Sequence, residues 1–592
     1  MSSDQESGAL HEFASSAKIS PPQGLQPLVQ RRRASELDPE VASLLDVQNR
    51  DRGSSLYGAF EEVKRRDAQD ISFAIRYFNP VRMLARAFSL PASQYYHDQQ
   101  LLEAVERVLT YNRKHVYPGC EQPGNWWAWH KQMPDCLTEI LVLMNGTLRH
   151  EDESYLLSVL EDLVGAGPVT VPAGAGRQPG LAGRDAISKF IIGVLTRSPE
   201  TVEHARKGMM EYVVPYLIEE DGTPLITILF KENLGISLPY TYEGFRPVIK
   251  WQRFAGGTSL ELEAAALAPI IRYCLGLGRW NTFRDVEVGW ISFTAYRSFW
   301  APAVSKEIAA LVAEVAPGQT EAEALRAFAE GRDSPPEGSR YWPNAETLIF
   351  RSPDTYCALI MASEDKHRIS WAYKNRHVDI GNKWYYGRDG HLVIARNEQE
   401  IDPRLTCTTD WRRLNGVTRD NGSVLRSGQI EKDTNGSWQP EWLLCRNPMA
   451  GAVTFDNGDA AAGIEVVSGE LRARKSYYFL KEEQTIVALT SHVKGEGSTE
   501  TTVHTFPVAE IPELVVNGER HVPEDGKTMW IKTPCWLHVE GAGYYFPDEG
   551  EVGVHDLLRG DDGGQPIQAG LRDLGVAPVR LGGREGVLRH LH

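Results

Sequence analysis

Residues 331–346 read GRDSPPEGSRYWPNAE, and this Pro-, Gly- and Ser-rich stretch separates two parts of the chain with different apolar patterns. Before it, apolar residues recur with a helical period; in residues 187–195 they fall at i, i+3, i+4, i+7 and i+8. After it come short β-rich runs such as TYCALIM (355–361), separated by Asn-Gly turn signals. The sequence therefore predicts an all-helical domain (51–330), a linker (331–346) and a β-sandwich domain (347–592).

The first 50 residues are polar and rich in Ser, Gln and Pro, which predicts a flexible N-terminal tail (1–50). They lack the basic start and apolar run of a secretory peptide, and the arginine triplet at 31–33 leads into Ala-Ser-Glu rather than into a hydrophobic segment. No run of about 18 apolar residues, the length that a membrane span needs, occurs in the sequence. We therefore expect a cytoplasmic protein with no membrane partner.

The composition is acidic, with 63 Lys and Arg against 79 Asp and Glu and a formal net charge of −16. Such a chain is not expected to bind nucleic acid, and it suits a polyanionic substrate only if positive charge is gathered locally. Its seven cysteines include no CxxC pair, which predicts reduced core residues. The sequence has no phosphate-loop, dinucleotide-binding, zinc-protease or serine-hydrolase motif, so it predicts no cofactor and no metal site.

Four strings along the chain resemble, in order, segments of polysaccharide lyase family 8, the hyaluronate, chondroitin AC and xanthan lyases. They are PGNWWAWHKQMPDCLTEILVLM (123–144), NKWYYGRDGHLVIARN (382–397), RKSYYFLKEEQTIVALTSHVKGEGSTETTVHTF (474–506) and WLHVEGAGYYFPDEGEVGV (536–554). The resemblance implies an incomplete (α/α) toroid followed by an antiparallel β-sandwich. It also implies that the small C-terminal sheet domain of the family is reduced or absent.

The resemblance implies a chemistry as well, in which a uronic acid is opened by β-elimination. In the family an Asn clamps the carboxylate, a His and a Tyr move the proton, arginines assist, and a Trp patch stacks the sugars. Such a reaction needs a donor that neutralises the carboxylate and an acid and a base within hydrogen-bond reach. In this chain the patch is matched by Asn125, Trp126, Trp127 and Trp129, while His130 stands where the family usually has Glu.

The other site motifs are only partly matched. The family's Asn position reads Gly183, although the following Arg184 is kept. The segment that carries the family's His corresponds to the stretch that begins at Asp221, and no histidine occurs from 205 to 366. Tyr242 is the best candidate for the catalytic Tyr. Both arginine positions of the last motif are aromatic here, as Trp290 and Phe293.

These departures favour a repurposed lyase scaffold. Our first hypothesis is an intracellular enzyme that encloses a hydrophobic small molecule, of terpenoid or polyketide type, and cyclises or isomerises it by proton transfer. Tyr242, helped by Tyr240, Glu243 or Asp221, would move the proton in a cleft lined by aromatic side chains.

Two alternatives stay open. One is a lyase on a uronate-containing glycan, with Tyr242 as acid and base and with Arg184 or Arg246 on the carboxylate. The other is a non-catalytic glycan-binding protein that uses Trp126 and Trp127. The lyase needs a basic cleft, the cyclase a closed apolar one, and the binding protein an open groove.

Overall fold

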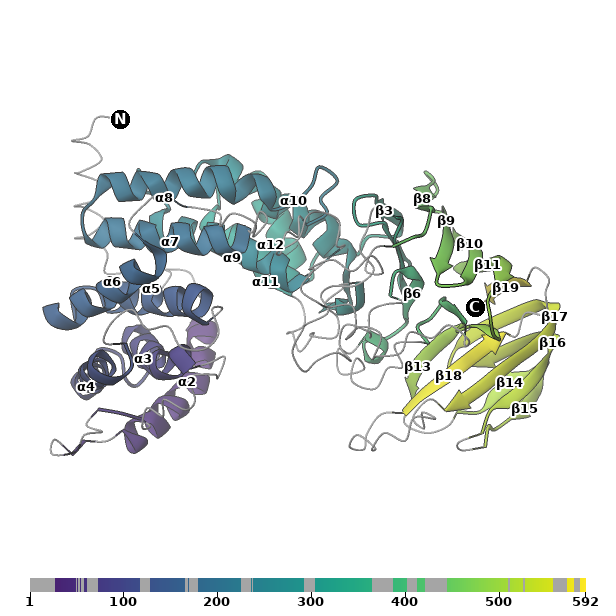
Figure 1. The fold of residues 1–592 in the computed structure, drawn as a ribbon, viewed down its shortest axis with the longest axis horizontal. Helices are drawn as coiled ribbons and strands as arrows, with labels where there is room; N and C mark the ends of the chain where they lie inside the picture. The colour runs from purple at the N-terminus through teal and green to yellow at the C-terminus, as the bar shows by residue number, and fades with distance from the viewer. Residues whose placement is uncertain are drawn as a thin grey trace.

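The computed structural model describes the chain from residue 27 to 591 with gaps. The described residues are 27–48, 50–51, 54, 58–60, 73–117, 128–165, 169, 179–224, 236, 238–291, 304–364, 387–401, 413–420, 445–508, 512–524, 527–556, 572–579 and 586–591. Helices occupy the N-terminal part and strands the C-terminal part, as Figure 1 shows. The predicted fold class is confirmed.

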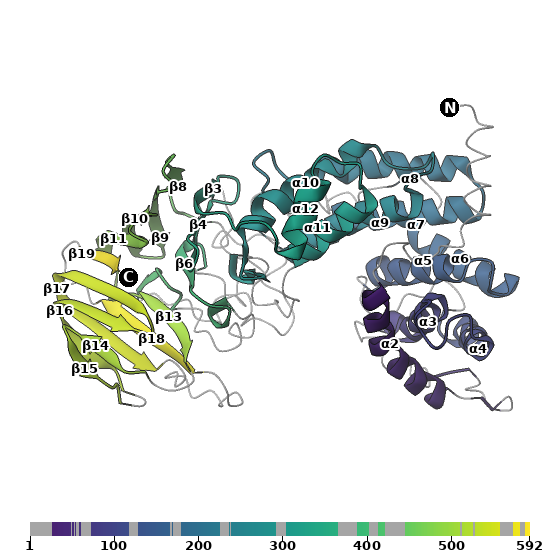
Figure 2. The ribbon, with the colours of Figure 1, turned by 180° about the vertical axis from the view of Figure 1, so that it is seen from behind.

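The helices form hairpins that stack side by side into an open arc (Figures 1 and 2). Consecutive odd-numbered helices from α3 to α11 contact one another in a row, and the even-numbered helices pack behind them. The α-helices are α2 (Pro27–Val47), α3 (Phe73–Ser89), α4 (Gln99–His115), α5 (Met133–Leu143), α6 (His150–Val164), α7 (Pro179–Leu195), α8 (Pro199–Tyr212), α9 (Leu238–Ala255), α10 (Ala268–Tyr273), α11 (Val304–Val315) and α12 (Ala322–Glu330).

Short elements join these helices. They are the π-helical turns η2 (Ala128–Gln132) and η5 (Cys274–Gly278), the 3-10 turns η3 (Val214–Tyr216), η4 (Ala264–Ala266) and η6 (Gly289–Ile291), and a small hairpin of β1 (Thr282–Phe283) and β2 (Val286–Glu287).

The helices start and pack as their sequences predict. Asp98 caps α4 by accepting a hydrogen bond from the amide of Leu101 at 2.7 Å, which satisfies one of the donors that a helix start leaves open. In α7 the apolar stripe that was read from the sequence is buried, including Ile187, Phe190 and Ile191. This burial of one helix face is what stabilises each hairpin against its neighbours.

The prediction of a flexible tail over residues 1–50 is wrong for residues 27–47, because they form helix α2, which packs against α3. Val41 is fully buried, and the partly buried Leu37, Leu44 and Leu45 pack against the same core. These positions have helical spacing, so α2 has an apolar face that a tail would leave in water. After the helix, the side-chain amide of Gln48 donates to the carbonyl of Ala104 at 2.8 Å.

Two main sheets follow the helices. A four-stranded antiparallel sheet has the order β3-β4-β5-β6, and a larger sheet carries most of the other strands. The strands of the first are β3 (Gly338–Trp342), β4 (Thr347–Arg351), β5 (Tyr356–Met361) and β6 (Asp389–Ala395). A 3-10 turn, η8 (Gln399–Ile401), follows β6, and β7 and β12 form a separate two-stranded pair. The strands after this turn are β7 (Thr418–Asp420), β8 (Met449–Thr454), β9 (Ala460–Ser468), β10 (Leu471–Leu480), β11 (Thr485–Lys494), β12 (Thr499–Thr501), β13 (His504–Val508), β14 (Leu514–Val516), β15 (Glu519–His521), β16 (Met529–Val539), β17 (Ala542–Asp556), β18 (Arg572–Val579) and β19 (Gly586–Leu591).

Turn signals in the sequence mark several of these connections. Asn517 and Gly518 both have positive φ, 50° and 91°, at the tight turn between β14 and β15. Residues 501–506 do not form one strand, because Thr501 ends β12 and His504 begins β13. The predicted linker 331–346 is also more structured than a linker, since it contains β3.

Strands β4, β5 and β6 of the four-stranded sheet are buried on both faces. Ile349, Ala358 and Ile360 belong to the core that the helices α7 to α12 build, whereas Leu348 and Leu359 belong to the core under the larger sheet. Side chains alternate between the two faces of a strand, so each of these strands serves both cores. Figure 2 shows the four strands standing between the helices and the large sheet.

Polar contacts reinforce the same junction. The Arg351 guanidinium of β4 donates to the backbone carbonyls of Arg279 and Thr282, at 3.3 and 2.5 Å, in the helical part. The Tyr356 hydroxyl donates to the side-chain oxygen of Asn281 at 2.8 Å.

The five described cysteines are buried and not disulfide-bonded, as predicted: Cys136, Cys274, Cys357, Cys445 and Cys535. Among the described helices, we find none that combines the length and the apolar character required to cross a membrane.

Candidate functional site

A pocket of about 280 Å³ opens on the row of odd-numbered helices and is strongly basic. Among the described residues that line it, six side chains are cationic, two are acidic, four are aliphatic or proline, and none is aromatic. The cations are Arg82, Arg86, Arg184, Arg246, Lys250 and Arg253, and the acids are Asp135 and Glu139. The chain is acidic as a whole, so this pocket is a local reversal of its charge.

Helical spacing brings these charges to one wall. Arg82 and Arg86 are four residues apart on α3, and Asp135 and Glu139 are four apart on α5. On α9, Arg246, Lys250 and Arg253 occupy successive turns. Residues at these separations share one helix face, so each helix contributes a short charged stripe to the pocket.

The two acids hold part of this charge in place. Asp135 pairs with Arg184 at 2.8 Å and with Lys250 at 3.5 Å, and Glu139 pairs with Arg86 at 2.6 Å. Burial acts to raise the pKa of Asp135, but the nearby charges of Lys250 and Arg184 outweigh it and lower this pKa. Asp135 therefore stays ionised and fixes the Arg184 guanidinium.

Two of the pocket arginines, Arg246 and Arg253, are not paired with an acid of the pocket. Arg246 and Arg253 are exposed on α9, and neither has a hydrogen bond or ion pair with another residue in the described part of the chain. The pocket thus keeps an excess of positive charge after its internal pairs are counted. Guanidinium groups suit a planar anion such as a carboxylate, which can accept two parallel hydrogen bonds.

A second charged pair lies at the start of α9. The Lys131 amine of η2 lies 3.0 Å from a carboxylate oxygen of Glu243, and the two side chains are only 3% and 15% exposed. Arg184 donates to the Lys131 carbonyl at 3.0 Å, which links this pair to the pocket wall. Burial lowers the pKa of Lys131 to about 8; the Glu243 carboxylate opposes this shift, and the Arg184 charge adds to it.

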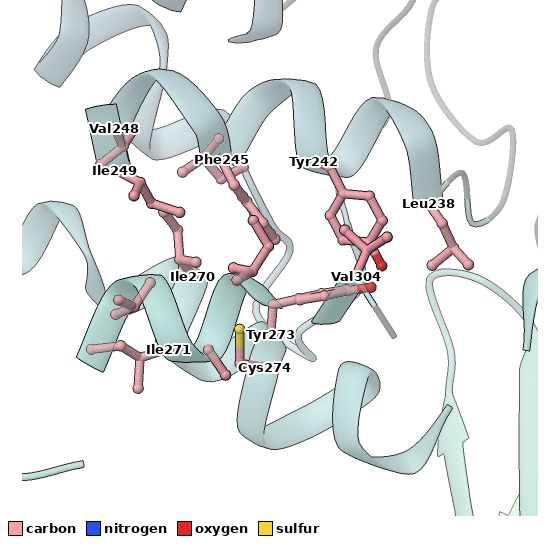
Figure 3. Close-up of a cluster of buried hydrophobic side chains, with 14 of the residues drawn as sticks. Leu238, Tyr242, Phe245, Val248, Ile249, Ile270, Ile271, Tyr273, Cys274 and Val304 are labelled. Atoms are coloured by element: carbon pink, nitrogen blue, oxygen red, sulfur yellow. The ribbon is translucent and has the colours of Figure 1, made fainter. Parts of the chain in front are cut away.

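Tyr242 is buried in the core, where Figure 3 shows its ring pointing from α9 toward Val304 and Tyr273. Its hydroxyl lies 3.3 Å from the Ser305 hydroxyl, which in turn donates to Glu287 at 2.5 Å. Tyr273 also donates to Glu287, at 3.4 Å. Burial, together with the Glu287 charge, holds the pKa of Tyr242 well above its usual value. The phenol therefore stays protonated in a closed polar cluster.

Gly183, where the resemblance places the family's Asn, lies against α9. A Cβ at this position would be 2.7 Å from the Cβ and Cγ atoms of Pro247, closer than real side-chain atoms approach. The glycine therefore serves close packing of α7 on α9, and no amide side chain fits there without a shift of one helix.

Asp221 lies elsewhere in the structure. One carboxylate oxygen accepts from the amide of Thr223 at 2.9 Å, and the other accepts from the amide of Asn344 at 3.1 Å. These bonds tie the turn after η3 to the four-stranded sheet. No contact of Asp221 with Tyr242 or Glu243 occurs among the described residues.

The other predicted site residues are only partly placed. His130 is exposed on η2, and Trp129 is buried in the helical core, where its ring lies 5.5 Å from that of Tyr117. The remaining predictions fall on positions or side chains outside the described residues: Asn125, Trp126, Trp127, Tyr240, Trp290 and Phe293.

Sequence reasoning found Arg184, Arg246 and Glu243 but missed their neighbours. Lys131, Asp135 and Lys250 lie in motifs and helices that the sequence analysis had marked, and a charged stripe at i, i+4 spacing was the available signal. Glu287 had no such signal, because its burial depends on helices that are distant in sequence.

Comparison with known proteins identifies the scaffold. The N-terminal alpha-helical domain of polysaccharide lyase family 8 matches residues 26–223, and the super-sandwich domain of the same family matches residues 337–560. The chain belongs to polysaccharide lyase family 8. The start of the first match at residue 26 agrees with helix α2 being part of the family's helical domain.

Three relatives illustrate this family 8 membership. A hyaluronate lyase of Thermasporomyces composti is 23% identical over 541 residues, which cover 80% of this chain and 64% of that protein. The hyaluronate lyase HylB of Enterococcus faecalis is 26% identical over 246 residues, which cover 39% of this chain and 23% of that protein. The chain therefore spans less than two thirds of the length of each. The structure of a Paenibacillus xanthan lyase has the same fold, with a TM-score of 0.75 at 16% identity over all of this chain and 59% of that one.

These findings favour the lyase alternative over the first functional hypothesis. The family 8 fold is shown, but the terpenoid- or polyketide-type cyclase receives no support from the comparisons. In the part of the chain that the structure describes, the lining of the pocket on the odd-numbered helices is basic rather than aromatic, because each helix turns charged side chains toward it. By the criterion drawn from the sequence, a basic cleft favours the glycan lyase.

Proposed function

We propose that this chain is a polysaccharide lyase that cleaves a uronate-containing glycan by β-elimination. The observation that carries the proposal is the basic pocket, in which Arg184 and Arg246, the two arginines expected to neutralise a uronate, line the same wall. A polyanionic substrate is compatible with an acidic chain only where positive charge is gathered, and the pocket meets this condition.

The two arginines have complementary properties. Arg184 is held by Asp135 and by the Lys131 carbonyl, so its guanidinium is already oriented when a substrate arrives. Arg246 is exposed and has no ion-pair partner among the described residues, so it can turn toward an incoming carboxylate. Preorganised charge of this kind stabilises the negative charge that develops on a uronate when its C5 proton leaves.

The reaction itself needs no external reagent. A base removes the proton at C5, the electron pair forms a C4–C5 double bond, and the bond from C4 to the glycosidic oxygen breaks. That oxygen then takes up a proton. The arginines bind the uronate carboxylate in the ground state and bind the more negative species formed on loss of the C5 proton more strongly, so their effect is greatest in the transition state.

The test is incubation of the purified chain with hyaluronan, chondroitin, xanthan and a glucuronan, followed by the ultraviolet absorbance of the unsaturated uronate. Hyaluronan comes first because two relatives carry the name hyaluronate lyase. A rise in absorbance supports the proposal. Binding of these polymers without any rise would instead favour the glycan-binding alternative, and neither binding nor turnover would refute both.

A further inference from the structure

We propose that Lys131 is the group that moves the proton in this chain and that Glu243 is its positioning residue. The proposal rests on the proposed function and deepens it, since it concerns the same β-elimination. It starts from a gap in the site: the sequence has no histidine from 205 to 366, and the Tyr242 hydroxyl is enclosed with Ser305 and Glu287 on the core side of α9.

The Lys131–Glu243 pair occupies the place where three motif segments meet. Lys131 follows the aromatic segment, in the π-helical turn η2 just before α5. Glu243 directly follows Tyr242 on α9, and its Cβ and backbone pack against Gly180 at the start of α7, where an added Cβ would lie 3.2 Å away. π-helical turns are costly and often mark functional positions.

The pair is also adjacent to the proposed carboxylate site. The same guanidinium nitrogen of Arg184, Nη1, donates to the Lys131 carbonyl at 3.0 Å and pairs with Asp135 at 2.8 Å. Arg184 therefore joins the proposed carboxylate site to the backbone of Lys131.

The surroundings of Lys131 suit proton transfer near neutral pH. The charged groups that act on its amine are Glu243 from α9, Arg184 from α7 and Asp135 from α5. Burial is the largest influence and lowers the Lys131 pKa to about 8, so an appreciable fraction of the amine is neutral in mildly alkaline solution. A base whose pKa lies near the working pH is the most effective proton carrier.

The step balances with Lys131 alone. The neutral Nζ takes the C5 proton of the uronate, the C4–C5 double bond forms, and the C4–O4 bond breaks. The resulting ammonium then donates a proton to the leaving O4, which returns the amine to its neutral form. Glu243 holds the amine in both states, and Arg184 stabilises the anion between them.

The decisive variant is Lys131→Arg, compared with Lys131→Met. Arginine keeps the charge and the ion pair with Glu243, but it does not deprotonate in proteins. We expect K131R to fold with an unfolding midpoint near that of the wild type, yet to lose about 100-fold or more in kcat, the range that a general base supplies. K131M should lose the same activity and also some stability.

Lys189 is the matched control. Its amine lies 2.9 Å from Asp185, and the two side chains are 3% and 19% exposed, almost the same as in the Lys131 pair. The Lys189 pair lies within α7, whereas Lys131 is joined to the pocket wall through the bond that its carbonyl accepts from Arg184. K189R should keep wild-type kcat. Full activity of K131R would overturn the proposal and leave the Lys131 pair a structural contact.

A pH profile gives an independent test that does not depend on a folded K131R. The Glu243 carboxylate raises the Lys131 pKa, so E243Q should move the ascending limb of kcat/KM to lower pH. A limb that stays in place or moves to higher pH contradicts the role of Lys131. If the wild type turns over no acidic glycan, the proposed function itself fails, which is a distinct result from an active enzyme whose K131R variant is equally active.

Discussion

Gly183 on α7 and Pro247 on α9 are in direct contact, and a Cβ at 183 would lie 2.7 Å from the proline ring. The resemblance places the carboxylate-clamping Asn of the family at this glycine. The absence of that Asn is therefore tied to the way two helices pack and is not an isolated change. The neighbours of this contact in sequence, Arg184 and Arg246, are the two arginines that line the basic pocket.

Restoring the family residue should harm this chain. We expect Gly183→Asn to destabilise it by about 1–3 kcal/mol or more, because the side chain overpacks the α7–α9 contact. Gly183→Ala should have a smaller effect of the same sign. Urea unfolding measures both, with Gly318→Ala as control, since a Cβ at 318 meets nothing within 4 Å. A G183N variant of unchanged midpoint and raised activity would contradict the close packing.

Arg246 is expected to act in binding and not in folding. Because it is exposed, Arg246→Gln should leave the unfolding midpoint unchanged, while weakening the binding of an acidic oligosaccharide about 10- to 100-fold, the equivalent of one charge-assisted hydrogen bond. The loss should shrink as salt is added. Titration calorimetry at two salt concentrations is the measurement. Arg272, exposed on α10 and outside the pocket lining, is the control; equal effects of R272Q would show a non-specific charge effect.

Glu287 makes stability depend on pH. Burial raises its pKa above 4.5, and the hydrogen bonds from Ser305, Tyr242 and Tyr273 only partly oppose this. A carboxyl with a raised folded-state pKa stabilises the fold below its unfolded pKa, and that contribution is lost as pH rises through the folded value. Glu287→Gln cannot ionise, so its stability relative to the wild type should increase from pH 4.5 upward.

Urea midpoints of E287Q and the wild type at several pH values test this, with the exposed Glu314→Gln as control. A constant difference between E287Q and the wild type across this range would mean that Glu287 has no shifted ionisation.

Arg351 should couple the two parts of the molecule. Its guanidinium donates to the carbonyls of Arg279, Trp280 and Thr282, and burial lowers its pKa to about 10. Arg351→Ala leaves these carbonyls unsatisfied, which should cost about 3 kcal/mol or more. We expect calorimetry to show two separated unfolding transitions for R351A. Arg472 is a suitable control, because it too donates to carbonyls but is exposed on β10; a single, unshifted transition in R351A would contradict the coupling.

Periodicity predicted the helices and strands well wherever one face alone is apolar. The apolar stripe in 187–195 predicted helix α7 correctly, because its apolar residues recur at regular helical spacing. Helix α2 was missed because its apolar positions, Leu37, Val41 and Leu44, follow an arginine triplet and are diluted by acidic residues. The strand β3 was missed because Pro, Gly and Ser around it are typical of a linker, while its partner β4 lies only a short turn away.

The site was harder to predict than the fold. Arg184 and Arg246 were found because motifs marked them. A role for Lys131 could not be predicted from its own segment, because its partner Glu243 lies on a helix more than a hundred residues later in the chain. The enclosure of Tyr242 depends in the same way on Glu287 and Ser305, which the chain brings in from two later segments.

The double-sided sheet β3–β6 has a practical consequence for exchanging parts between related lyases. A cut at 331–346, where the sequence suggests a boundary, would remove Ile349, Ala358 and Ile360 from the helical half and leave part of its interior in water. The interchangeable unit of the N-terminal half therefore extends through Ala395, the end of β6. A join beyond β6 keeps the helical interior intact but separates Leu348 and Leu359 from the core under the larger sheet, so the residues that face them there must be exchanged together with the sheet.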